Sequence, residues 1–63
     1  MMEYAARVYF SKDWKRCIIQ KDGDNVVMTF YFKDGKRTEF TLSKEEWWKF
    51  LDILGLSEII EVV

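Results

Sequence analysis

The sequence has no histidine, no proline and a single cysteine among its 63 residues. One cysteine cannot form a disulfide within the chain, and without histidine the usual ligand sets of a zinc site cannot be assembled. General acid–base catalysis near neutral pH most often uses histidine, so its absence argues against an enzyme. No apolar run approaches the roughly 20 residues of a membrane span, and the start of the chain lacks the features of a signal peptide. We therefore expect an intracellular protein, cytoplasmic or in the nucleoid or nucleus, with no metal or cofactor.

Aromatic residues are abundant, with three Trp, three Tyr and five Phe. A chain of this length buries only about 60% of its surface on folding, which leaves a lone domain marginally stable. Dense aromatic packing or oligomerisation is therefore expected to support it. The formal net charge is −1, with a slightly basic segment 1–42 and an acidic segment 43–63. This weak polarity is no basic patch by itself.

Turn and capping motifs divide the chain into expected elements. Asp22-Gly23 and Asp34-Gly35 are typical of hairpin turns, and Ser43 followed by Glu46 matches a capping box at the start of a helix. The ranges rich in aromatic and β-branched residues, which favour strands, are 4–10, 14–20, 25–32 and 36–42. A helix is expected over 44–54, and residues 56–63 fit either a helical turn or a short edge strand. The sequence therefore predicts one α+β domain over 1–63, a four-stranded antiparallel β-meander followed by one C-terminal α-helix packed on one sheet face.

The second hairpin decides which strand faces are buried. A three-residue loop with Gly35 in a bulge places Phe30 on the face of Phe40, whereas a two-residue loop would place it beside Glu39. Burial favours the first arrangement. The expected inner face, covered by the helix, is Cys17, Ile19, Val26, Met28, Phe30, Phe32, Phe40 and Leu42. The outer face is then Trp14, Arg16, Ile18, Val27, Thr29, Tyr31, Arg37, Glu39 and Thr41.

This outer face combines aromatic rings with cations. A two-residue loop at Asp22-Gly23 would pair Trp14 with Tyr31 across the strands. Proteins that bind single-stranded nucleic acids stack bases on aromatic rings within a positively charged groove. The residues expected to bind nucleic acid are Trp14, Arg16, Tyr31, Lys33, Lys36 and Arg37.

The predicted helix has more apolar surface than one sheet can cover. Its apolar arc spans about 220°, against the roughly 100° that one packed face needs. Either residues 56–63 fold back over it, or a second subunit covers it in a homodimer. The residues expected at the dimer interface are Trp48, Phe50, Ile53 and Leu54.

Other chemistry has weaker support in the sequence. Cys17 falls on the inner face with no histidine partner, which favours a structural thiol over a nucleophile. The acidic loop that begins at Asp22 resembles a calcium loop, but its twelfth position is Lys33 instead of glutamate. We therefore expect no catalytic residues and no metal site.

A family resemblance lies mainly in residues 40–54. The run Phe40-Thr41-Leu42-Ser43-Lys44-Glu45-Glu46-Trp47, followed by Phe50-Leu51, resembles the end of the positive-cofactor-four-like transcriptional coactivators. That resemblance implies a homodimer formed through the helix and single-stranded DNA bound on the sheet. By position, it implies that the basic binding residues are Arg16, Lys33, Lys36 and Arg37.

Two functions follow as expectations. The first is single-stranded nucleic-acid binding, most of all of single-stranded DNA, on the outer sheet face in transcription or replication. The second is a small homodimeric interaction or regulatory module, for example viral or accessory, that binds no nucleic acid. The near-zero net charge and the acidic segment 43–63 favour the second.

Overall fold

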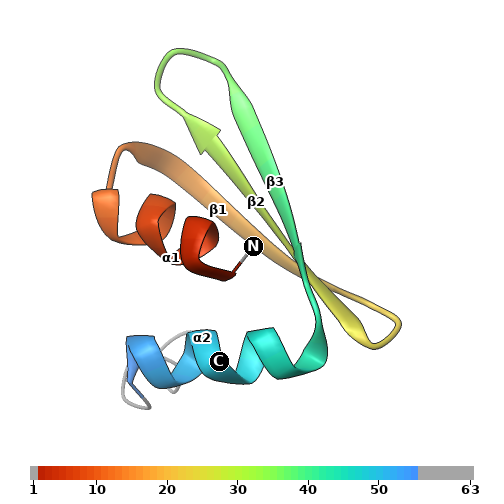
Figure 1. The fold of residues 1–63 in the computed structure, drawn as a ribbon. Coiled ribbons are helices and arrows are strands. Elements are labelled where there is room, and N and C mark those ends of the chain that lie inside the picture. The colour runs from red at the N-terminus through yellow and green to blue at the C-terminus, as the bar shows by residue number, and fades with distance from the viewer. Residues whose placement is uncertain (1, 56–63) are drawn as a thin grey trace.

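The computed structural model describes residues 2–55, in which two helices pack on one face of a three-stranded antiparallel sheet (Figure 1). The elements in chain order are α1 (Met2–Ser11), β1 (Trp14–Asp22), β2 (Asn25–Phe32), β3 (Arg37–Leu42) and α2 (Lys44–Leu54). The sheet order is β1-β2-β3, so β2 is the central strand. Within this part of the chain no helix is long and apolar enough to cross a membrane. The alternatives for residues 56–63 lie outside the described residues.

The expected first strand, residues 4–10, is wrong, because this segment belongs to helix α1. Its aromatic and β-branched residues indicated a strand, but residues that pack against the core follow helical spacing. Met2, Ala5 and Tyr9 lie three and four positions apart, and all three pack against the core. The Tyr9 ring meets the Phe50 ring of α2 edge-on, with centroids 5.7 Å apart. Packing of this helical face outweighs the strand propensity of individual residues, so the predicted four-stranded meander with a single helix is incorrect.

The first hairpin turns one residue later than expected. Asp22 pairs with Asn25 around a two-residue turn, and Cys17 pairs with Phe30 instead of Met28. This pairing is shifted by two residues along β2 from the expected one. Because side chains alternate along a strand, a shift of two keeps each residue on its expected face. Cys17 therefore still faces the helices.

The second hairpin has the expected face assignment. Phe30 pairs with Thr38 and Met28 pairs with Phe40, which is the arrangement that the longer loop predicts. Gly35 has a φ of 89°, a conformation that favours glycine. Its N–H donates to the Phe32 carbonyl at 3.1 Å and closes the turn. The Phe30–Thr38 and Met28–Phe40 pairs therefore point toward the helices.

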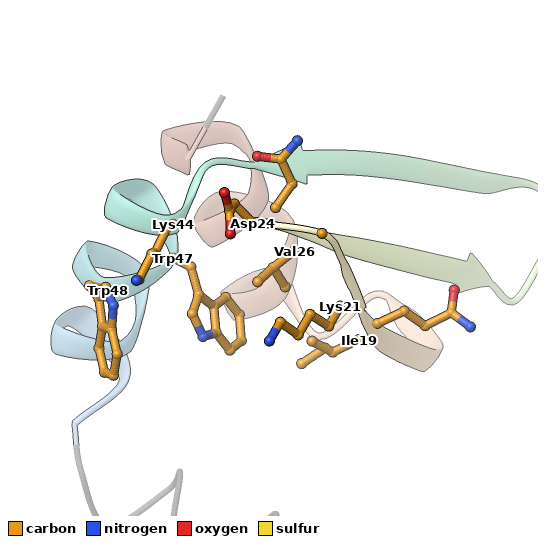
Figure 2. Close-up of a pocket in the computed structure, with 10 residues that line it drawn as sticks. Ile19, Lys21, Asp24, Val26, Lys44, Trp47 and Trp48 are labelled. Carbon is orange, nitrogen blue, oxygen red and sulfur yellow. The ribbon is translucent and has the colours of Figure 1, made fainter.

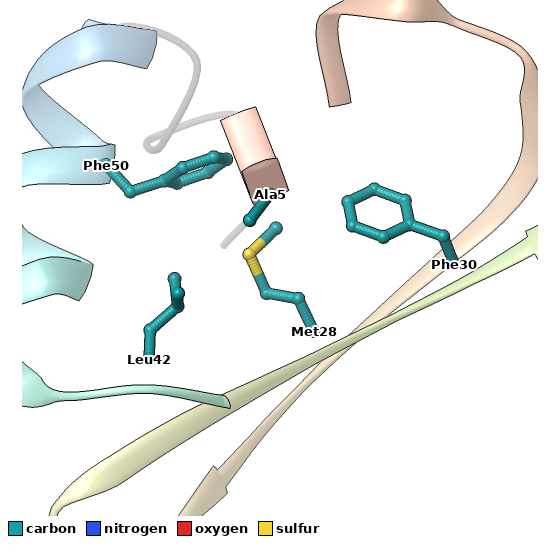
Figure 3. Packing of buried hydrophobic residues seen from close by; sticks show 5 residues of the cluster. All are labelled: Ala5, Met28, Phe30, Leu42 and Phe50. Carbon is teal, nitrogen blue, oxygen red and sulfur yellow. The ribbon is translucent and has the colours of Figure 1, made fainter. Parts of the chain in front are cut away.

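The core lies between the sheet and both helices. Its fully buried members are Ala5, Met28, Phe30, Leu42 and Phe50. Figure 3 shows the Met28 side chain reaching from β2 toward Ala5, with Phe50 approaching from α2. Helix α1 contacts α2 and the strands β1 and β3. Both helices thus cover the same face of the sheet.

Helix α2 begins with the predicted capping box. The Glu46 N–H donates to Ser43 Oγ at 3.2 Å, and the Ser43 N–H donates to Glu46 Oε1 at 2.9 Å. At the other end, the Gly55 N–H donates to the Leu51 carbonyl at 3.0 Å. These bonds satisfy backbone groups that a helix end leaves without an internal partner.

Truncation of Phe50 tests this core. We expect Phe50→Ala to lower the free energy of unfolding by about 3–5 kcal/mol, because it opens a cavity at a fully buried site. Urea unfolding followed by circular dichroism measures the loss. The control Ile53→Ala, at a side chain 49% exposed, should cost well under about 1 kcal/mol. Phe50→Leu should fall between them, and equal effects of Phe50→Ala and Ile53→Ala would contradict this core.

The capping box also predicts a pH dependence. The hydrogen bond from the Ser43 N–H lowers the pKa of the Glu46 carboxyl from its ordinary value of 4.5. The pKa of this carboxyl is lower in the folded than in the unfolded chain, so its ionised form stabilises the fold. This stabilisation is complete when the pH is above the pKa of the unfolded chain, and it is lost as the pH falls through the pKa of the folded chain. Glu46→Gln should remove this part of the acid sensitivity, as measured by urea unfolding between pH 3 and 6. Glu45→Gln should retain it, and identical profiles for the two variants would argue against the cap.

Candidate functional site

The sheet face opposite the helices, hereafter the open face, carries the candidate site. Strand alternation and register assign to it Arg16, Ile18, Gln20, Val27, Thr29, Tyr31, Arg37, Glu39 and Thr41. Its most chemically distinctive row crosses all three strands, because Tyr31 on β2 pairs with Arg16 on β1 and with Arg37 on β3. Tyr31 is half-buried and both arginines are exposed. Directly opposed side chains in a sheet lie close enough to touch a common ligand.

Trp14 does not share this face, so its expected role as a stacking surface beside Tyr31 is wrong. The register shifts between Trp14 and Arg16, and Trp14 pairs with Phe32 instead of Tyr31. The extra residue of this irregularity turns the preceding side chain to the opposite face. The Trp14 ring lies 5.8 Å from the Phe30 ring, and its Nε1 donates to the Tyr9 carbonyl at 3.0 Å. Trp14 therefore extends the core.

Cations gather at the end of the sheet that holds the Arg16–Tyr31–Arg37 row. Six of the ten Lys and Arg residues lie there, on the α1–β1 junction, the starts of β1 and β3, and the β2–β3 turn: Lys12, Lys15, Arg16, Lys33, Lys36 and Arg37. The acidic residues of the same region are Asp13, Asp34 and Glu39. The Asp34 carboxylate accepts a hydrogen bond from the Lys36 backbone N–H at 2.9 Å and so stabilises the turn. The net charge of this end of the sheet is positive, whereas that of the whole chain is −1. We call this end of the sheet the basic end.

The four residues expected at a dimer interface have different environments. Phe50 is fully buried in the core, so its placement at an interface is wrong. Leu54 is half-buried and packs against the core. Trp48 and Ile53 are the exposed members of these four, at 59% and 49%.

A cleft lies between the β1–β2 hairpin and the first turns of α2 (Figure 2). This cleft has a volume of about 380 Å³. Its walls include Ile19, Lys21, Asp24, Val26, Lys44, Trp47 and Trp48. Sequence reasoning missed it, because hairpin and helix are distant in the chain. The available signal was the wide apolar arc of the predicted helix, which includes both Trp47 and Trp48 and exceeds what one sheet can cover.

Neither a reactive thiol nor a metal centre is evident in residues 2–55. Cys17 is half-buried, and this burial raises the pKa of its thiol, which favours the unreactive protonated form. No group of three or more potential metal-ligating side chains of His, Cys, Asp or Glu occurs in this range.

No family model, curated protein or solved structure matches this chain. The resemblance of residues 40–54 to the positive-cofactor-four-like coactivators therefore stays a prediction. Function is inferred from the surfaces of the chain itself.

Proposed function

We propose that this chain binds single-stranded nucleic acid, single-stranded DNA above all, on its open face, in transcription or replication. The observation that carries the proposal is the cross-strand row in which Tyr31 lies between Arg16 and Arg37. The Tyr31 ring offers a stacking partner to a base. The two guanidinium groups beside it offer positive charge to the phosphates on either side of that base. No covering element among residues 2–55 lies over this face.

Each residue type has a distinct energetic contribution. Stacking of a base on the Tyr31 ring is worth about 1–3 kcal/mol. Arg16 and Arg37 supply planar, permanently charged donors, and Lys33 and Lys36 extend the positive surface along the exposed β2–β3 turn. Phosphate contacts release counterions, so these four cations predict binding that weakens steeply with salt.

Glu39 limits the extent of this surface. It is exposed on β3 and pairs with Thr29 in the row next to Tyr31. A carboxylate there repels phosphates and confines a bound strand to the row of Tyr31 and the adjoining turn. The proposed contact is therefore short, which fits a chain with a net charge of −1.

Exposed apolar surface on α2 favours a second candidate function, that of a homodimeric interaction module. Ile53 is 49% exposed near the end of the helix, beside the half-buried Leu54. A second copy would remove this surface from water and would support a small core.

An oligonucleotide titration tests the first proposal. We expect the fluorescence anisotropy of a labelled oligo-dT to rise with added protein at 50 mM salt. Tyr31→Ala should weaken binding by about 5- to 150-fold, the equivalent of 1–3 kcal/mol of stacking, whereas Tyr31→Phe should retain most of it. Replacing both Arg16 and Arg37 with Gln should make the plot of log binding constant against log salt concentration less steep, by about 1.4 in slope.

Lys49→Gln is the matched control, because Lys49 is an exposed cation on α2, away from the open face. It should leave affinity nearly unchanged. The proposal fails if no binding occurs at 50 mM salt, or if Tyr31→Ala and Lys49→Gln have equal effects. Oligo-U in place of oligo-dT distinguishes a preference for DNA from one for RNA.

Light scattering after size-exclusion chromatography tests the second candidate. A homodimer would elute at twice the mass of the 63-residue chain, and Ile53→Glu should shift it to the monomer because a charge would be buried at the contact. Glu45→Gln, at an exposed site in the first turn of α2, serves as control. A monomeric mass at micromolar concentration would exclude this dimer.

A further inference from the structure

The cleft beside α2 lies away from the Arg16–Tyr31–Arg37 row, and Gln20 is the one open-face residue in its lining. Its hairpin wall is the turn between β1 and β2, at the end of the sheet opposite the β2–β3 turn of the basic end (Figure 1). Its volume of about 380 Å³ lies within the range of about 300–1,000 Å³ that is typical of small-molecule sites. A ligand bound here would therefore be independent of the nucleic-acid proposal.

The apolar walls of the cleft include a fixed aromatic platform. The Trp47 ring stacks on the Phe50 ring, with centroids 5.8 Å apart and planes 13° from parallel. Because Phe50 is fully buried, this stacking holds Trp47 in place. Trp48 and Ile19 are 59% and 42% exposed, so the cleft leaves apolar surface in water that a flat apolar ligand would cover.

Two cations face the same cleft from different elements. Lys21 lies on the hairpin and Lys44 in the first turn of α2, and Figure 2 shows the Lys21 side chain directed toward Trp47 and that of Lys44 beside Trp48. Among residues 2–55 neither ammonium group forms an ion pair with a carboxylate. Asp24 is the acidic residue in the wall, so the lining has an excess of one positive charge. This balance fits a single negative charge better than a chain of phosphates.

We infer that this cleft binds a small organic anion with a flat apolar body, namely an aromatic carboxylate. The aromatic ring lies against Trp47, between Trp48 and Ile19. The carboxylate lies within reach of the ammonium groups of Lys21 and Lys44. An apolar interior with a few placed polar groups is the usual design of such sites.

The test is a titration of the ¹⁵N-labelled full chain with 2-naphthoate, followed through the indole N–H signals of the tryptophans. We expect saturable shifts at Trp47 and Trp48, with smaller ones at Trp14, which lies outside the cleft lining. The neutral isostere 2-naphthamide should bind several times more weakly, because it lacks the charge. Lys21→Gln and Lys44→Gln should each weaken naphthoate binding about two- to fivefold, and Lys49→Gln should not.

Trp48→Ala provides an independent check, since an exposed side chain is replaced without loss of core packing. It should weaken both naphthoate and naphthamide. The inference is overturned if the two probes bind equally, if the shifts fail to saturate at millimolar naphthoate, or if they centre on Trp14. It is also overturned if nuclear Overhauser effects in the unliganded protein place a second copy, or residues 56–63, against the Trp48 indole.

Discussion

Burial of Met28 and Phe30 in the central strand is the constraint on which the rest of the structure depends. Both side chains are fully buried, and both point to the same face of the sheet because they are two residues apart. To cover them, α1 supplies Ala5 and α2 supplies Phe50. With both helices committed to one side, the opposite side of the sheet keeps its arginines and Tyr31 uncovered.

The irregularity at the start of β1 decides the composition of both faces. Trp14 and Arg16 would share a face in a regular strand, since they are two residues apart. The shift between them sends Trp14 into the core beside Phe30 and leaves Arg16 opposite Tyr31. The same local feature adds an aromatic ring to a small core and removes one from the open face. A base bound at this row would therefore find one ring and two guanidinium groups.

The two ends of the sheet differ in chemistry because different elements adjoin them. At the β2–β3 turn, cations from three segments meet on an exposed surface. At the β1–β2 turn, the hairpin meets the start of α2, and the Trp47 ring anchored on Phe50 forms the floor of a cleft. Extended polyanions suit the first surface and a small flat anion suits the second. The proposed nucleic-acid site and the inferred carboxylate site therefore do not compete for residues.

Local interactions explain what the sequence by itself determined. The start of α2 depends on hydrogen bonds between Ser43 and Glu46, three residues apart, and the β2–β3 turn depends on Gly35 within one short segment. The alternation of apolar residues gave the faces of β2 and β3 once the loop length was known. The state of residues 4–10, the side on which Trp14 lies, the burial of Phe50 and the cleft were decided only by the tertiary structure. Each of these depends on contacts between residues far apart in the chain, and local propensity contains no information about them.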